Sequence, residues 1–281
     1  MPRPASPFER LHAAGSFDAP ADLPGRSAAS GGTAAGEVEL QVLGVVRAVG
    51  AAVPFTSQRA LDLACYLAVN RDGATADTLR HWLWPRAAPP PRPKTFANVV
   101  SRARVCLGQD ADGEPYLCHL GADRVYRLSA EVTTDLDRFD AWLRLAERAG
   151  PERALECLLA AFWLVRGAPF GGGSGDTFSW ADAFWRSHVE CLLDSTAHRL
   201  ADLALELGRF EVARWANLRG LVVTPDCEQC WQRRIAVAQR TGDSRESERL
   251  ARHLDRLLSE PLPELPEPPP SAVGAVSSLA L

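Results

Sequence analysis

The chain has 281 residues, of which 46% are hydrophobic, and its formal net charge is −4 at pH 7. This length and hydrophobic content suffice for two domains, each with its own core. No apolar run reaches the roughly 18 residues that a membrane span needs, and the N-terminal segment lacks the apolar stretch of a signal peptide. Seven cysteines, an odd number, do not suggest a disulfide framework. We therefore expect a cytoplasmic protein whose cysteines are free thiols.

The charge is distributed unevenly along the chain. Residues 38–128 hold 11 Lys and Arg against 8 Asp and Glu, which gives +3. The following residues hold 17 and 23, which gives −6, and the first 37 residues contribute −1. The first folded part is thus weakly basic, and it is the part in which we look for contacts with nucleic acid.

The first half of the chain begins with residues 1–36, which are rich in Pro, Ala, Gly and Ser and are expected to be disordered. Alternating apolar residues over 38–49 then predict a small antiparallel sheet. Ser57 is a suitable N-cap for a helix that runs to about Val69, and Thr75 for a shorter helix that Pro85 stops. A proline-rich connector, residues 89–93, leads to a third helix.

This third helix is basic and amphipathic. Residues 92–109 contain four cations and no acid. At 100° per residue the apolar side chains gather on one face, which we expect to be buried: Phe96, Val99, Val100, Ala103, Cys106 and Leu107. The opposite face holds donors of the kinds that reach phosphates and base edges: Asn98, Ser101, Arg102 and Arg104, with the apolar Val105 among them.

A short ribbon follows the basic helix. After Gly108, residues 116–128 are expected to form two short strands around a turn at 121–123. Alternation along the second strand places Arg124 on one side and Arg127 on the other, so at least one of the two must point inward or along the sheet. A helix followed by a ribbon with an Arg near its tip is the outline of a winged helix.

From residue 136 onward the pattern is helical. The predicted helices are Leu136–Ala149, Glu152–Val165, Trp180–Leu207, Phe210–Val222, Cys227–Arg240 and Glu246–Leu258. Gly208 and Gly242 are 34 residues apart, the period of tetratricopeptide helix pairs, and each is placed at a tight turn where a side chain would clash. Gly150 is placed at a similar turn. The glycine-rich segment 170–176 is interpreted as a flexible insertion and the Pro/Glu-rich tail from Glu260 as disordered.

Other features give little support to a metal site or to catalysis. Cys227 and Cys230 have no second ligand pair at metal spacing, so their thiols are expected to pack between helices. No Gly-Lys-Ser/Thr follows the glycine run, and the chain has no nucleophile elbow. Tryptophans at apolar-stripe positions are expected to pack in the core: Trp142, Trp163, Trp215 and Trp231. We expect no enzyme activity, no cofactor and no metal.

Several short motifs, in this order and spacing, resemble a known family. The segments Leu40-Gln-Val-Leu-Gly44, Arg59-Ala-Leu61, Leu83-Trp-Pro85, Val100-Ser-Arg-Ala-Arg104 and Val125-Tyr-Arg-Leu128 are similar to the winged-helix domain of SARP-type transcriptional regulators. The segments Thr134-Asp-Leu-Asp-Arg-Phe139, Leu164-Val-Arg-Gly-Ala-Pro-Phe170 and Trp180-Ala181 resemble the bacterial transcriptional activator domain that accompanies it. The glycine-rich loop and Trp180 are more similar to a subset whose large members also carry LysM modules and membrane spans.

The resemblance implies that the third helix enters the major groove of DNA and that the wing reaches the adjacent minor groove. It assigns contacts to residues at the start of the helix, on its exposed face and on the wing: Lys94 and Thr95, then Ser101, Arg102 and Arg104, and Arg124 or Arg127. The helical pattern adds Asn98. The family commonly has a cation where this chain has Val105. An apolar residue there can touch a thymine methyl group, or it can belong to a domain that has lost DNA binding.

The sequence therefore predicts a mainly α protein, with an N-terminal winged helix-turn-helix that includes small β-sheets and an all-α, tetratricopeptide-like domain after it. The predicted boundaries are 1–36, 37–129, 130–259 and 260–281. The predicted function is that of a DNA-binding transcriptional activator whose helical domain self-associates as a homodimer or holds a partner. Double-stranded DNA is the expected ligand, and the resemblance implies contact with RNA polymerase. The alternative is a protein-interaction module whose winged helix no longer binds DNA.

Overall fold

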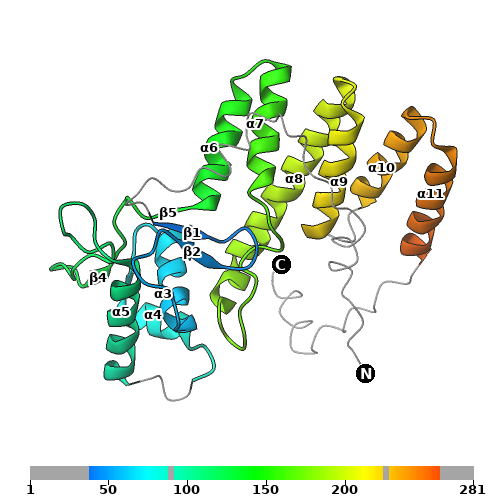
Figure 1. The fold of residues 1–281 in the computed structure, drawn as a ribbon. Helices are drawn as coiled ribbons and strands as arrows, with labels where there is room; N and C mark the ends of the chain where they lie inside the picture. The colour runs from blue at the N-terminus through cyan, green and yellow to red at the C-terminus, as the bar shows by residue number, and fades with distance from the viewer. Residues whose placement is uncertain (1–37, 88–91, 224–227, 260–281) are drawn as a thin grey trace, which may run out of the picture.

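A computed structural model describes residues 38–87, 92–223 and 228–259. The chain is mainly helical, with a winged helix-turn-helix that includes small sheets and a row of helix pairs extending from it (Figure 1). The predicted fold class is confirmed. Among the described residues, no helix is long and apolar enough to span a bilayer. The predictions for the N-terminal segment and the Pro/Glu-rich tail fall outside the described ranges.

A small three-stranded sheet connects the two parts. β1 (Glu39–Gln41) pairs antiparallel with β2 (Arg47–Val49), as predicted, with Leu40 opposite Ala48. β5 (Thr133–Thr134) adds to the other edge of β1 in parallel, so the strand order is β2-β1-β5. The sequence analysis misses β5 because two residues are too short to show alternation. The helical domain therefore begins directly from this sheet.

The two helices after the sheet begin where the caps predict. α3 (Gln58–Val69) follows Ser57, whose side chain accepts a hydrogen bond from the backbone N–H of Ala60. α4 (Ala76–Leu83) follows Thr75, which accepts from Thr78. Thr75 also belongs to β3 (Ala74–Thr75), a second short strand that the sequence analysis misses. Both helices bury leucines, among them Leu63 and Leu79, in the core of the winged helix.

The rest of the chain forms helix pairs close to the predicted ones. The helices are α6 (Asp135–Glu147), α7 (Pro151–Trp163), α8 (Trp185–Glu206), α9 (Phe210–Val223), α10 (Glu228–Arg240) and α11 (Ser244–Ser259). The helix predicted over 180–207 is divided into the short 3₁₀ helix η1 (Ser179–Ala183) and α8. Consecutive helices lie side by side as α6–α7, α8–α9 and α10–α11 (Figure 1). This is the tetratricopeptide-like arrangement.

The turns of the repeat contain glycine for a reason other than the predicted clash. Gly208 and Gly242 have φ angles of +69° and +76°, and a Cβ atom at either position would meet nothing within 4 Å. What requires glycine there is the left-handed backbone, which costs other residues about 1–2 kcal/mol. Gly150 precedes α7 with φ −68°, and its turn has no such requirement.

The glycine-rich segment is packed against the winged helix. Phe170 and Phe178 are each 1% exposed. The backbone of Gly171 bonds to that of Val46 at 3.0 Å and to that of Gly44 at 2.9 Å. Both phenylalanines have left-handed backbones, with φ 55° and 61°, a strain that burial of their rings offsets. Phe170 and Phe178 therefore anchor the chain on both sides of the loop, whereas residues 172–175 are exposed, and the flexibility of the loop itself stays a prediction.

The tryptophans predicted to lie in the core are half-buried at its edge. Trp163 and Trp215 stack with their ring centroids 5.5 Å apart, and the guanidinium of Arg219 lies over both rings. Trp142 and Trp231 are also half-buried. The fully enclosed tryptophan is Trp180, which is 3% exposed.

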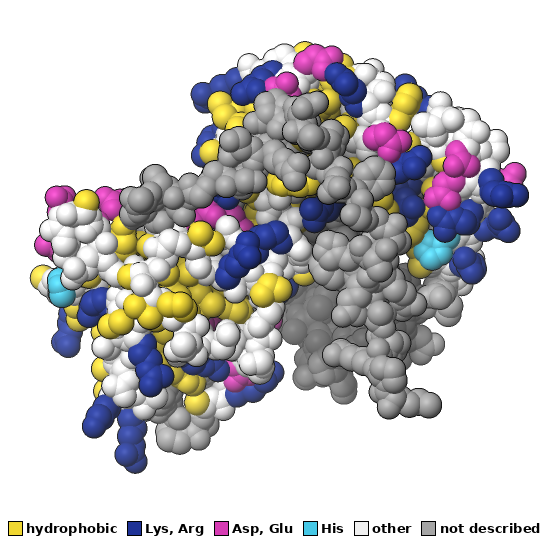
Figure 2. Space-filling model, in the orientation of Figure 1, with side chains coloured by type: hydrophobic (Ala, Val, Ile, Leu, Met, Phe, Trp, Pro, Cys, Tyr) yellow, Lys and Arg dark blue, Asp and Glu magenta, His cyan; other side chains and the backbone are white. Residues whose placement is uncertain are grey.

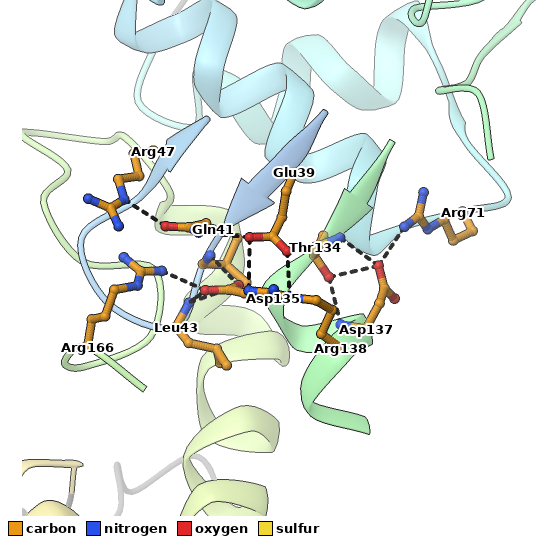
Figure 3. Close-up of polar contacts among 11 residues, drawn as sticks. Glu39, Gln41, Leu43, Arg47, Arg71, Thr134, Asp135, Asp137, Arg138 and Arg166 are labelled. Atoms are coloured by element: carbon orange, nitrogen blue, oxygen red, sulfur yellow. Dashed lines mark hydrogen bonds and ion pairs between the residues drawn. The ribbon is translucent and has the colours of Figure 1, made fainter. Parts of the chain in front are cut away.

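Buried acids hold the two parts together (Figure 3). Asp135, at the start of α6 and 1% exposed on its side chain, accepts hydrogen bonds from the backbone N–H groups of Val42 at 2.6 Å and Leu43 at 3.2 Å. It also pairs with Arg166 at 2.6 Å. Glu39 of β1 pairs with Arg138 of α6 at 2.7 Å. The carboxylates therefore satisfy backbone groups and cations that come from both parts of the chain.

Another buried acid, Asp62, lies where η1 meets α3. Asp62 accepts hydrogen bonds from the indole N–H of Trp180 at 2.6 Å and the backbone N–H of Phe178 at 3.2 Å. Its other oxygen pairs with Arg59 at 3.0 Å. Burial raises the pKa of Asp62 from 3.8 to about 6, although all three partners act in the opposite direction. The hydrophobic core is continuous across residue 130, so the two predicted domains meet in a buried junction.

Candidate nucleic-acid interface

The basic helix is α5 (Pro93–Leu107). Pro93 occupies its first turn, where no N–H needs an intrahelical partner. It ends at Gly108, whose φ is +89° and where a Cβ atom would come within 2.7 Å of the Cβ of Ala52. The predicted buried face is confirmed in every position: Phe96, Val99, Val100, Ala103, Cys106 and Leu107 are buried. This packing determines which side chains face solvent.

Five of the predicted DNA contacts share the exposed side of α5. The side chains of Lys94, Thr95, Asn98, Ser101 and Arg102 are exposed. Within the described ranges, none of them makes a side-chain hydrogen bond or an ion pair. Asn98, Ser101, Arg102 and Val105 follow one another at helical spacing, so they form one stripe. Val105 is 61% exposed. Figure 2 shows Lys and Arg side chains projecting from the end of the molecule where Figure 1 places α5.

Arg104 differs from the other five residues. Its side chain is half-buried and turns toward the ribbon, where Nε donates to the carbonyl oxygen of Leu117 at 3.1 Å. Nη2 donates to the carbonyl oxygen of Cys118 at 3.3 Å. Charge-assisted bonds of this kind are stronger than neutral ones. Arg104 therefore holds the ribbon against α5, and its contact with DNA stays a prediction.

The ribbon is simpler than the predicted pair of strands. Its two arms meet at a bridge between Leu117 and Leu128, and the N–H of Cys118 donates to the carbonyl of Arg127 at 3.0 Å. The second arm contains β4 (Val125–Tyr126), which pairs antiparallel with β3 rather than with a full strand of the first arm. The predicted first strand is thus reduced to this bridge.

Two contacts fix the base of the ribbon. A Cβ atom at Gly73 would lie 2.3 Å from the carbonyl oxygen of Tyr126, so glycine is needed for β3 and β4 to meet. The ring of Tyr126 contacts that of Phe96 edge-on, with centroids 5.5 Å apart. The ribbon is therefore attached both to α5 and to the turn before α4.

The two wing arginines are in different situations. Arg124 lies at the tip with φ 56°, is exposed, and makes no ion pair with the described residues. Arg127 pairs with Asp123 at 2.6 Å, and this contact lowers the pKa of Asp123. An exposed pair of this kind contributes little to stability. The structure thus leaves Lys94 and Arg102 as exposed cations on α5, with Thr95, Asn98 and Ser101 between them along the helix, and Arg124 as an exposed cation at the tip of the ribbon.

Comparisons with known proteins bear on the fold. No protein-family model matches this chain, and no curated protein sequence matches it. A solved structure of Mycobacterium tuberculosis EmbR, in complex with a low-affinity phosphopeptide, is similar to it with a TM-score of 0.60. The two chains are 21% identical, and the match covers 87% of this chain and 71% of that one. The chain therefore shares with EmbR a winged helix-turn-helix followed by a helical domain.

Proposed function

We propose that this chain is a SARP-type, DNA-binding transcriptional regulator that uses α5 and the ribbon to bind promoter DNA. The observation that carries the proposal is the stripe on α5, where polar and cationic side chains project without partners among the described residues, while the apolar residues of the helix other than Pro93, Ala97 and Val105 are buried. Unpaired cations and amide or hydroxyl groups on one exposed helix face are what major-groove binding requires. The shared fold with EmbR supports the arrangement.

We assign each side chain to a kind of DNA contact according to its chemistry and its place on the surface. Lys94 at the start of α5 and Arg124 at the ribbon tip are assigned to phosphates or to the minor groove, where charge matters more than geometry. Asn98, Ser101 and Arg102 are assigned to base edges, because their donors and acceptors lie along the middle of the stripe. Val105 ends the stripe and is suited to a thymine methyl group. Arg104 keeps the ribbon in place.

The helical domain is assigned to self-association or to a partner, and RNA polymerase is the partner that the family resemblance implies. A regulatory role as an activator rests on the same resemblance. The relation to LysM-containing proteins rests on two short motifs and is a prediction of the sequence alone.

The test is duplex binding as a function of salt. Selection of bound fragments from random duplex DNA first provides the site. The variant Lys94→Ala/Arg102→Ala should then bind it more weakly, and the slope of log affinity against log salt should become less steep by about 1, because Lys94 is assigned to a phosphate and Arg102 to a base edge. The matched control is Arg245→Ala/Arg256→Ala, which removes the same charge from exposed positions on α11 and should bind as the wild type does.

Absence of duplex binding by the folded wild type at low salt would refute the proposal. It would favour the second candidate, a protein-interaction module, to which the apolar Val105 on the exposed stripe also points. A loss of binding that is equal in the α5 variant and in the α11 control would likewise contradict the assignment, because it would show a general charge effect.

A further inference from the structure

A cluster of three possible metal ligands lies between two helix pairs, away from the DNA-binding surface. Asp194 and His198 are four residues apart on one face of α8, and Cys230 is on α10. Cys230 is buried, and the other two are half-buried. Nε2 of His198 is 3.6 Å from Oδ1 of Asp194 and 3.5 Å from Sγ of Cys230. All three donor atoms lie within 4.8 Å of one another.

The hydrogen bonds among the described residues leave one buried oxygen of this cluster without a donor. The same nitrogen of His198 faces both the carboxylate and the thiol, and a neutral imidazole nitrogen either donates one proton or accepts one. The distance to Asp194 is also too long for a hydrogen bond. Oδ1 of Asp194 is buried and has no hydrogen-bond partner in the described residues. A buried carboxylate oxygen without a donor is costly, and a cation among the three atoms would satisfy it.

The charges around the cluster are compatible with a cation. The guanidinium of Arg233 makes two bonds to Asp202, at 2.7 and 2.8 Å. Asp194 and a Cys230 thiolate together would balance the charge of a divalent ion.

Two of the three separations between the donor atoms agree with tetrahedral coordination. Zinc binds nitrogen and carboxylate oxygen at about 2.0–2.2 Å and thiolate sulfur at about 2.3 Å. Tetrahedral angles then place nitrogen and sulfur about 3.6 Å apart, and nitrogen and oxygen about 3.4 Å apart. The observed separations are 3.5 and 3.6 Å. A Cβ atom at Gly220 would lie 3.0 Å from Sγ of Cys230, so a glycine there keeps space around the sulfur.

We propose that Asp194, His198 and Cys230 bind a zinc-like divalent cation, with a water molecule as the fourth ligand. Binding forms the metal–sulfur bond and releases the thiol proton of Cys230 to solvent. Because α8 belongs to one helix pair and α10 to the next, the ion joins consecutive pairs of the repeat. The sequence analysis considered Cys230 only with Cys227, which lies outside the described residues. The overlooked signal is an Asp and a His four residues apart on the preceding repeat.

Cobalt(II) is the probe, because its bond to a thiolate produces a charge-transfer absorption in the near ultraviolet. The metal-free, reduced full chain should bind one cobalt ion with this absorption, and zinc should displace it. Cys230→Ser should abolish the absorption. Asp194→Asn and His198→Ala should each weaken cobalt binding at least tenfold. Cys191→Ser, at an exposed position of the same helix, is the control and should bind as the wild type does.

A second measurement covers the case in which a variant folds poorly. Excess zinc should raise the melting temperature of the wild type and of Cys191→Ser, and it should raise that of Asp194→Asn by a smaller amount. Absence of thiolate–cobalt absorption in the wild type would overturn the proposal. So would an absorption that persists in Cys230→Ser, or an equal zinc-induced shift in Asp194→Asn. None of these outcomes depends on DNA binding.

Discussion

Asp62 offers a direct test of the buried junction. Its side chain is 0% exposed and lies between Arg59 of its own helix and Trp180 of η1. Replacement by Asn keeps an oxygen that can accept from the Trp180 indole, but it removes the charge. The variant Asp62→Asn should therefore change how the stability depends on pH more than it changes the shape of the junction.

The magnitude follows from the pKa. In the folded chain the pKa of Asp62 is about 6, against 3.8 for an ordinary aspartate. The folded state thus holds the proton more tightly, and the wild type gains stability as the pH falls through 6 toward 4. Each pKa unit is worth about 1.4 kcal/mol, so this shift is worth about 3 kcal/mol in full and about 2 kcal/mol by pH 4. Above pH 6 this contribution is lost, because Asp62 is then charged in both states.

Urea unfolding at pH 4 and at pH 7 measures the effect. The free energy of unfolding of the wild type minus that of Asp62→Asn should be larger at pH 4 than at pH 7 by about 2 kcal/mol. Other acids, among them Asp135, titrate in both proteins, so their contribution cancels when the free energy of unfolding of the variant is subtracted from that of the wild type. Asp72→Asn, at an exposed turn, makes the same change of charge and is the control. Parallel pH dependences for the wild type and Asp62→Asn would refute the assignment of a raised pKa to this carboxyl group.

Two further predictions concern the turns and the ribbon. Gly208→Ala and Gly242→Ala should each lower the free energy of unfolding by about 1 kcal/mol, because alanine disfavours their left-handed φ. Gly150→Ala should not lower the free energy of unfolding. If urea unfolding gave the same loss for all three variants, the left-handed backbone would not explain the glycines at 208 and 242. Arg104→Ala should speed hydrogen exchange of the Cys118 amide, because the ribbon loses its attachment to α5. It should also weaken DNA binding, but the slope of log affinity against log salt should change by less than in Lys94→Ala/Arg102→Ala. An unchanged exchange rate would show that Arg104 does not hold the ribbon.

The parts of the fold that the sequence predicts are those governed by local geometry. The alternation of buried and exposed residues along α5 follows from the helical period, which is why Ala103 and Leu107 are buried and Val105 is exposed as expected. The caps Ser57 and Thr75 are also local, since each bonds to a backbone N–H three residues later. Such features can be read from a few consecutive residues.

The buried acids could not be predicted in the same way. Asp62 stands in an apolar helix with nothing nearby in the sequence to show that it is fully enclosed. Its partners Phe178 and Trp180 follow 116 and 118 residues later. Asp135 resembles an ordinary first-turn acid, yet it accepts from Val42, 93 residues before it. The anchoring of the glycine-rich loop could not be predicted for the same reason, because its composition gives no sign of the surface on which Phe170 and the nearby Phe178 are buried.

The candidate DNA surface follows the helical period more closely than the predicted set of contacts does. At 100° per residue Arg102 and Arg104 lie about 200° apart, so they do not share one face of α5, and the prediction that grouped them was wrong. Arg104 lies at the edge of the buried face, where its side chain is half-buried and bonds to carbonyls 13 and 14 residues later. Of the predicted contacts, this leaves Lys94, Arg102 and Arg124 as cations without an ion pair in the described residues. At about −0.9 per phosphate contact, even three contacts of one chain would give only a shallow salt slope and weak binding. Two chains on neighbouring half-sites would double the contacts, so the proposed DNA binding would be strengthened if the chain acted as a dimer.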